Sequence, residues 1–323
     1  MSADVVHIIL TCTKRKTRRA AAGLELHGVP GATPESRAAA WIERLRAHEG
    51  DRLPVGELYS GDHWQVGRSL RRIAENAGHR VVTWVCSAGY GLLALDAPVA
   101  PYSATFSSTH PDAVTRGLSG LPRPEVLRRW WEALSAWKGP VAGAPRTFRD
   151  IAARDAGTAM WIIASAPYLQ ATASDVAAAA EALNDPGRLA VFSAGARSVR
   201  EVEPFLLPYD LRMREKVGGA AMSLNVRVAR ELLSAGCAFD RTTLSEALGG
   251  MVAGLGRPAA PKRPTMTDDE VIRFLRAQLD VDPVLACTPL LRRLRDVEGR
   301  ACEQKRFGEL YRRVRRDVAA EPA

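Results

Sequence analysis

The 323-residue chain is 46% hydrophobic and 25% charged, a globular composition with enough residues for one large domain and a smaller one. It has 45 Lys and Arg against 36 Asp and Glu, a formal net charge of +9 that favours a polyanionic partner. No apolar run is long enough to span a bilayer, and five scattered cysteines form no Cys-x-x-Cys pair, which argues against a membrane span, a disulfide scaffold and a zinc site.

Four short apolar runs predict strands that are covered on both faces, at Val5–Leu10, Arg80–Cys86, Ala159–Ala164 and Arg188–Phe192. Apolar residues at helical spacing lie between them. They predict helices over Ser36–Ala47, Trp64–Ala77, Pro124–Trp137 and Ala220–Leu233, and an alanine-rich helix that Ser174 caps. Because strands alternate with helices, we expect an α/β fold with a mostly parallel, doubly wound sheet over residues 1–248.

Residues 249–266 are rich in Gly and Pro and are interpreted as a linker to a small C-terminal all-α module over 267–323. A capping box at Thr267–Glu270 opens the first of its three expected helices. Residues 284–316 hold ten basic and four acidic side chains, which is typical of a helix-turn-helix or winged-helix unit. A packing or oligomerisation module in an arginine-rich chain would have the same pattern. The side chains expected to contact nucleic acid here are Arg292, Arg293, Lys305, Arg306 and Arg312.

Small and hydroxyl-bearing residues follow each predicted strand, at Thr11–Lys16, Cys86–Gly91, Ser165–Tyr168 and Ser193–Gly195. Ligands of parallel sheets bind outside the carboxyl ends of the strands, so these four segments are expected to enclose a polar pocket. In the first segment, Lys14, Arg15 and Lys16 are expected to hold phosphate groups.

Several well-known catalytic motifs are missing from the chain. It contains no G-x-x-x-x-G-K-[ST], no G-x-G-x-x-G after the first strand, no H-E-x-x-H and no G-x-S-x-G. These absences argue against an ATPase, a dinucleotide-dependent oxidoreductase, a zinc protease and a serine hydrolase. We expect no metal ion and no cofactor.

An ordered set of motifs in the first third of the chain resembles a known family. The set is Cys12-Thr-Lys14-Arg-Lys16, Glu57-Leu-Tyr59, His63-Trp64, Ser87-Ala-Gly-Tyr-Gly-Leu-Leu93, Asp96 and Pro101-Tyr102-Ser103. Over residues 5–106 it is similar to the YaaA-like superfamily, which includes the YaaA peroxide-stress proteins, the core domain of archaeosine synthases, and phage-defence DNA glycosylases that excise glucosylated hydroxymethylcytosine. The chain departs from that pattern at Gly89, where a larger residue, commonly lysine, is expected.

The resemblance implies a pocket for a nucleobase that has been flipped out of a duplex. The residues expected to form it are Cys12, Tyr59, Tyr90, Ser165, Ser193 and Asn225, with Trp64 and Phe106 as further aromatic walls. Any one of these aromatic side chains could equally belong to an ordinary core.

Breaking a glycosidic bond also calls for a carboxylate that positions water and stabilises an oxocarbenium-like transition state. Asp96 is the first choice for this role, with Asp62 and Asp210 as reserves, although Asp96 could simply cap the turn before Pro98. The expected catalytic set is completed by Tyr102 and Ser87.

The function expected from the sequence is therefore that of a DNA glycosylase that removes a modified base from double-stranded DNA, in defence against phage. Two alternatives stay open: a non-catalytic DNA-binding protein of the YaaA type, and a transferase that modifies a tRNA or DNA base. We expect a soluble, cytoplasmic protein with no membrane partner.

Overall fold

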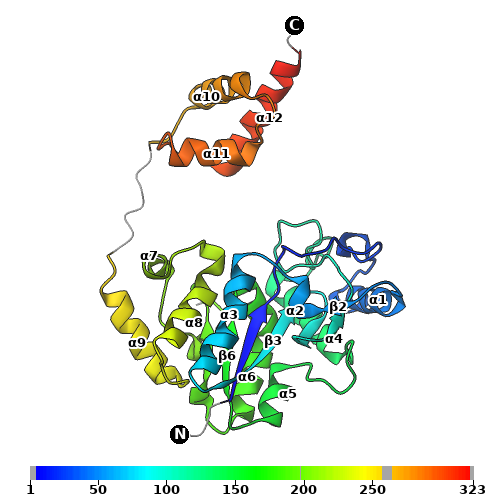
Figure 1. The fold of residues 1–323 in the computed structure, drawn as a ribbon. Helices are drawn as coiled ribbons and strands as arrows, with labels where there is room; N and C mark the ends of the chain where they lie inside the picture. Colours follow the sequence, from blue (N-terminus) through cyan, green and yellow to red (C-terminus); the bar gives the residue numbers. More distant parts are fainter. Residues whose placement is uncertain (1–4, 197, 257–263, 321–323) are drawn as a thin grey trace. The chain divides into compact units, whose positions relative to one another are not determined.

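The computed structural model describes residues 5–196, 198–256 and 264–320. The chain forms two compact units, residues 1–256 and 257–323, and each has its own hydrophobic core (Figure 1). Most of the expected linker, residues 257–263, lies outside the described residues. The two units are therefore described separately.

The first unit is built on a five-stranded sheet with the strand order β4-β3-β1-β6-β7. The four parallel strands are β1 (Val5–Thr11), β3 (Arg80–Ser87), β6 (Ala159–Ile163) and β7 (Leu189–Phe192). They match the four predicted runs, so the α/β fold with a mostly parallel sheet is confirmed. The edge strand β4 (Gly91–Ala94) was not predicted, and it pairs antiparallel with β3.

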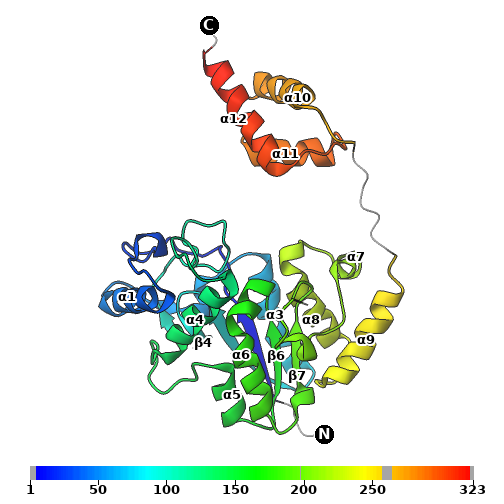
Figure 2. The ribbon, with the colours of Figure 1, turned by 180° about the vertical axis from the view of Figure 1, so that it is seen from behind.

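Helices cover both faces of this sheet (Figures 1 and 2). On one face, α3 (Asp62–Asn76) packs against α8 (Leu224–Ser234). On the other face, α6 (Ala166–Ala182) packs against both α4 (Arg123–Ala136) and α5 (Phe148–Arg154). The remaining elements of the first unit are α1 (Pro34–Ala47), which packs on α4, the short α2 (Val55–Leu58) and α7 (Arg214–Val217), α9 (Arg241–Ala253), and a two-stranded sheet of β2 (Leu53–Pro54) and β5 (Pro98–Val99).

Two predicted boundaries are wrong. The alanine-rich helix α6 begins at Ala166, so Ser174 lies in its middle and does not cap it. Pro167 is accommodated in the first turn because a backbone N–H has no helical partner there. The expected linker also begins too early, since α9 continues through Gly249 to Ala253. Packing of its last turn against the core outweighs the low helix propensity of glycine.

The connections between strands create a crevice beside β1. The chain passes from β1 to β3 on one side and then crosses to β6 on the other side of β1, so the direction of winding reverses between β1 and β6. In doubly wound sheets the loops diverge at such a point and leave room for a ligand at the carboxyl edge.

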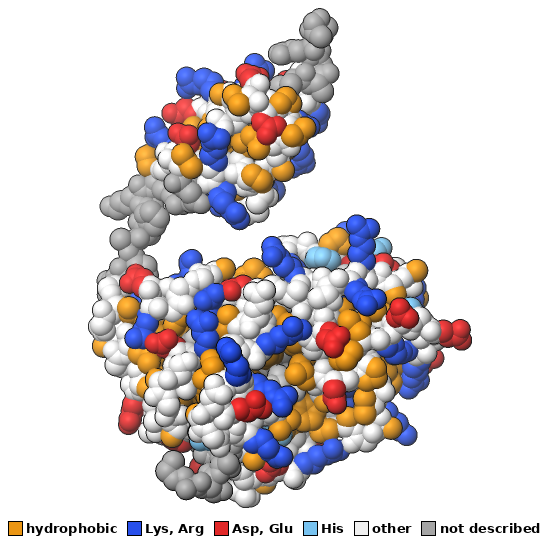
Figure 3. All heavy atoms as spheres, viewed as in Figure 1, with side chains coloured by type: hydrophobic (Ala, Val, Ile, Leu, Met, Phe, Trp, Pro, Cys, Tyr) orange, Lys and Arg blue, Asp and Glu red, His pale blue; other side chains and the backbone are white. Residues whose placement is uncertain are grey.

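The second unit consists of three helices, α10 (Asp268–Val281), α11 (Cys287–Asp296) and α12 (Gln304–Ala320), within the residues that the structure describes. The predicted capping box is confirmed, because the Thr267 side chain accepts a hydrogen bond from the Glu270 N–H at 3.3 Å. Leu275, Leu294 and Phe307 lie in the core that the three helices share. Lys and Arg side chains are spread over the visible face of this unit (Figure 3).

Candidate functional site

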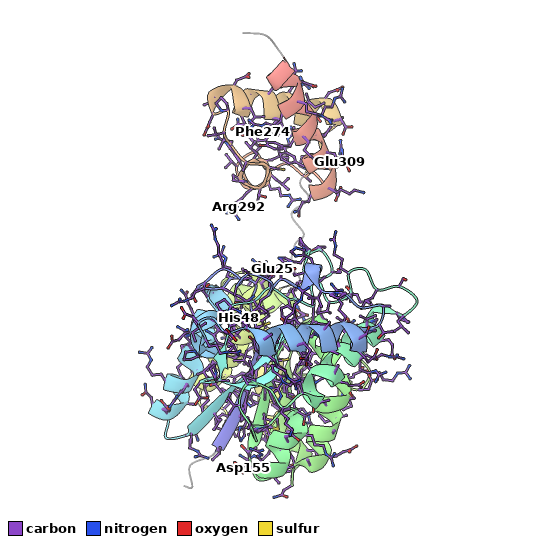
Figure 4. The ribbon with its side chains drawn as sticks, turned by 90° about the vertical axis from the view of Figure 1, so that its right-hand side faces the viewer. Glu25, His48, Asp155, Phe274, Arg292 and Glu309 are labelled. Carbon is purple, nitrogen blue, oxygen red and sulfur yellow. The ribbon has the colours of Figure 1, made fainter. Side chains whose placement is uncertain are left out.

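A cavity of about 580 Å³ lies between the loops that follow β1 and β6, where the winding reverses. In Figure 4 this carboxyl edge of the sheet is the end of the first unit near Glu25, and Asp155 marks the opposite edge. The start of helices α3, α4 and α8 and the loop at residues 103–110 complete the walls. The described residues that line the cavity are Thr11, Cys12, Thr13, Lys14, Lys16, His63, Ser103, Ala104, Thr105, Ser107, Ser108, His110, Arg123, Ala164, Ser165, Pro167, Tyr168, Met222 and Asn225.

The lining is basic and rich in hydroxyl groups. Lys14, Lys16 and Arg123 bring three cationic side chains, and seven Ser and Thr residues bring hydroxyls. Among the described lining residues there is no Asp or Glu. Cations and hydroxyl donors bind phosphate oxygens, whereas a lining carboxylate would repel them, so the cavity suits a phosphate-bearing ligand.

The side chain of Lys16 lies against two tyrosine rings. Its side chain is half-buried, and Nζ lies 4.6 Å from the centroid of the Tyr102 ring and 5.8 Å from that of Tyr59. Burial lowers the pKa of Lys16 from its ordinary value, against the opposing influence of Cys12 and Asp112. The neutral amine is therefore more accessible here than on an exposed lysine.

A chain of hydroxyl groups forms the floor beneath Lys16. The Tyr102 hydroxyl lies 2.8 Å from the Tyr59 hydroxyl and 2.7 Å from Ser87 Oγ. Burial raises the pKa of both tyrosines well above the ordinary value. The three residues, together with Tyr90, are almost completely buried, and none is among the described residues that line the cavity. The expectation that Ser87, Tyr59, Tyr90 and Tyr102 face the ligand is therefore wrong, because their polar atoms bond to one another or to backbone.

Distant side chains hold the backbone of the motif segment 87–93. Trp130 and Trp41 donate their indole N–H groups to the carbonyls of residues 88 and 89, at 2.8 and 2.7 Å. The buried guanidinium of Arg146 donates to the carbonyls of residues 90 and 92. The motif is thus a fixed platform under the cavity.

The structure also places Asp96 away from the cavity. Because β4 runs antiparallel to β3, the chain has turned back from the carboxyl edge before it reaches Asp96, which is exposed in a turn. The reserve carboxylates Asp62 and Asp210 each form an ion pair with an arginine, Arg227 and Arg212 respectively.

A buried carboxylate that the sequence did not indicate, Asp112, contacts a residue of the cavity wall. It is 5% exposed, and its Oδ2 accepts a hydrogen bond from Ser103 Oγ at 2.6 Å. Its Oδ1 accepts from the backbone N–H of His27 at 2.9 Å and lies 2.7 Å from His27 Nδ1. Burial opposes ionisation, yet the hydrogen bonds from Ser103 and His27 outweigh it and hold the pKa of Asp112 below its ordinary value. Asp112 is therefore an anion, and it orients a hydroxyl that faces the cavity.

Several predicted pocket residues do meet in the cavity wall. Cys12 Sγ lies 2.8 Å from the Tyr168 hydroxyl, and Ser165 stands at the start of α6. Asn225 bridges two strand ends, since its Nδ2 donates to the carbonyl of residue 164 at 2.9 Å and its Oδ1 accepts from the N–H of residue 194 at 3.1 Å. Ser193 is buried outside the described lining, and its Oγ has no hydrogen-bond partner among the described atoms.

The basic residues predicted to contact nucleic acid fall into different settings. Lys14 lines the cavity, whereas Arg15 is exposed beside it. In the second unit, Arg292, Arg293, Lys305 and Arg312 are exposed, and Figure 4 shows Arg292 on the outer side of α11. Arg306 instead ties α12 to α10, because its Nε donates to Asp268 at 2.6 Å.

Comparison of the chain with protein-family models, with curated proteins and with solved structures finds no match. Within the described residues, no group of three His, Cys, Asp or Glu side chains is arranged to hold a metal ion. No helix in the described part of the chain is both long and apolar enough to cross a bilayer.

Proposed function

We propose that this protein is a DNA glycosylase of the YaaA-like type, which draws a nucleotide out of a duplex into the cavity and excises its base. The cavity itself carries the proposal. Its volume of about 580 Å³ is typical of a small-molecule site. Its lining combines cationic and hydroxyl-bearing side chains with apolar ones. A flipped nucleotide needs such a pocket for its base and cations for its phosphates.

Ser103 and Asp112 support the hydrolytic part of the proposal. The N-glycosidic bond breaks through an oxocarbenium-like state, which water must then attack. Ser103 lines the cavity and donates its O–H to the Asp112 carboxylate, so its oxygen keeps its lone pairs to accept a hydrogen bond. A water molecule that donates to this oxygen would be oriented toward C1′, with the Asp112 charge close to the developing cation. In this proposal Asp112 takes the role first expected of Asp96.

The second unit is proposed to hold the duplex as a helix-turn-helix-like module. On α11, Arg292 and Arg293 are exposed beside Thr288, Pro289 and Val297, with which they line a shallow groove of about 390 Å³. Exposed cations beside small polar and apolar side chains suit a phosphate backbone and a groove edge.

The glycosylase proposal is tested with duplexes that contain cytosine, hydroxymethylcytosine or glucosylated hydroxymethylcytosine, followed by alkali. Alkali-labile strand breaks in a modified duplex are expected. Asp112→Asn should lower the yield at least tenfold, and Asp96→Asn, a change of the same kind in an exposed turn, should leave it unaltered. Intact strands in every duplex, together with tight binding, would overturn excision and leave the non-catalytic binding protein.

The duplex-holding role is tested by salt dependence in the full-length chain. Replacing both Arg292 and Arg293 with Gln should reduce the slope of log K against log salt by about 1 to 2, because each phosphate contact contributes about 0.9. Lys138→Gln removes an exposed cation two residues beyond the end of α4 and serves as the control. An unchanged slope in the double variant would argue against a DNA contact through α11.

A further inference from the structure

We propose that Lys16 is a nucleophile that forms a Schiff base with the aldehyde of an abasic deoxyribose, which gives the protein a strand-cleaving lyase activity. This inference rests on the proposed function, because the aldehyde substrate is the product of base excision. It adds a second reaction in the same cavity, on a substrate of different chemistry.

The position of the amine supports this role. Lys16 lines the cavity, and the structure gives it no ion pair within the described residues. Its Nζ rests above the ring of Tyr102, at 4.6 Å from the centroid, and that ring is fixed from below by the Tyr59 and Ser87 hydroxyls. A confined amine that has no ion pair among the described residues, on a side chain that lines a ligand cavity, meets the geometric requirement for attack on a carbonyl.

The electrostatic surroundings favour the reactive form. Burial lowers the pKa of Lys16, which raises the fraction of neutral amine at neutral pH. Lys14 shares the cavity but is exposed, so it is better suited to holding a phosphate than to attacking a carbonyl. The two lysines would therefore have different tasks.

The reaction balances without any redox partner. The lone pair of Nζ attacks C1′ of the open-chain sugar, and loss of water gives a protonated imine. The imine acidifies C2′, whose proton passes to solvent as the C3′–O bond breaks, and the electron pair leaves with the 5′-phosphate of the downstream strand. Water then hydrolyses the imine, which regenerates the Lys16 amine and leaves an unsaturated aldehyde on the upstream strand. Lys14 and Arg123, which line the same cavity, would stabilise the departing phosphate.

Borohydride trapping on a preformed abasic duplex tests the inference without the excision step. Sodium borohydride reduces an imine to a stable amine, so a covalent protein–DNA adduct is expected, and peptide mapping should place the deoxyribose remnant on Lys16. Lys16→Arg keeps the positive charge but forms no imine under these conditions, and it should lower adduct yield at least tenfold. Lys138→Arg, an exposed lysine outside the cavity, is the matched control and should keep full yield.

The outcomes separate the two proposals. An adduct that maps to another amine, or full adduct yield in a folded Lys16→Arg protein, would refute the role of Lys16. Binding of the abasic duplex without any adduct would refute the lyase and leave the glycosylase proposal standing. Failure to bind any duplex, modified or abasic, would overturn the proposed function and the lyase with it.

Discussion

The hydroxyl chain beneath the cavity makes a quantitative prediction for Tyr102→Phe. The substitution removes one oxygen that lies 2.8 Å from the Tyr59 hydroxyl and 2.7 Å from Ser87 Oγ, at a site that is 1% exposed. The ring stays in place, so no large void forms, and the loss is that of two buried neutral hydrogen bonds. At about 0.5–1.5 kcal/mol each, the free energy of unfolding should fall by about 1–3 kcal/mol.

A double-mutant cycle sharpens this prediction. Tyr59→Phe removes the bond to Tyr102 and should cost about 1 kcal/mol. The double variant should be within a few tenths of a kcal/mol of Tyr102→Phe in its free energy of unfolding. The bond between the two hydroxyls is already lost in Tyr102→Phe, so the second change does not remove it again. Strict additivity of the two single changes would refute the hydroxyl chain, as would a Tyr102→Phe protein within about 0.5 kcal/mol of the parent.

Tryptophan fluorescence during urea unfolding measures the relevant transition. All seven tryptophans lie in the first unit, so the signal reports on that unit alone. Tyr311→Phe is the control, since it removes a hydroxyl that donates to the carbonyl of residue 285 within the second unit. It should leave the fluorescence transition unchanged.

Two further predictions concern packing and pH. A Cβ on Gly89 would lie 2.4 Å from Cε2 of Tyr102, so Gly89→Ala should lower the free energy of unfolding by about 1–3 kcal/mol, whereas Gly157→Ala, with nothing within 4 Å, should change it by less than about 0.5. Burial lowers the pKa of His63 to about 4, so the unfolded chain binds more protons below pH 6.5 and stability should fall by up to about 3 kcal/mol as pH drops to 4. Burial raises the pKa of Asp175 to about 6, so its contribution has the opposite sign, and stability falls by about 2 kcal/mol as pH rises from 4 to 6. Relative to the wild-type profile between pH 4 and 6, the slope of stability against pH should be more negative in His63→Gln and more positive in Asp175→Asn; parallel profiles in all three proteins would contradict these assignments.

The sequence was most informative where one physical rule decides the structure. Strands that are buried on both faces must be apolar throughout, and this property located all four parallel strands. It could not locate β4, which is four residues long and begins at Gly91 with a φ of 75°. The end of α9 was missed for a related reason, because its Gly249 fits a helix only through packing that local propensity does not contain.

The position of the site was predictable from the sequence, but its chemistry was only partly so. Ligands of parallel sheets bind at the carboxyl ends of the strands, and this rule correctly predicted that residues of segments 11–16 and 165–168 line one cavity. The position predicted for Asp96 was wrong because β4, the strand that precedes it, runs antiparallel to β3 and leads the chain away from the carboxyl edge. Asp112 escaped notice because its partners, Ser103 and His27, come from separate segments that meet only in the folded chain. No periodicity or spacing in the sequence indicates that these three residues are in contact.

The most conspicuous motif of the chain, residues 87–93, supports the cavity and does not line it. A segment that must present a fixed surface needs its backbone groups satisfied, and residues 87–93 meet this need with donors from Trp41, Trp130 and Arg146. The groups that can exchange protons or bond to a ligand lie on the loops above it, with Lys16 among them. A dense motif in this fold is therefore better evidence for where a site lies than for which atoms react there.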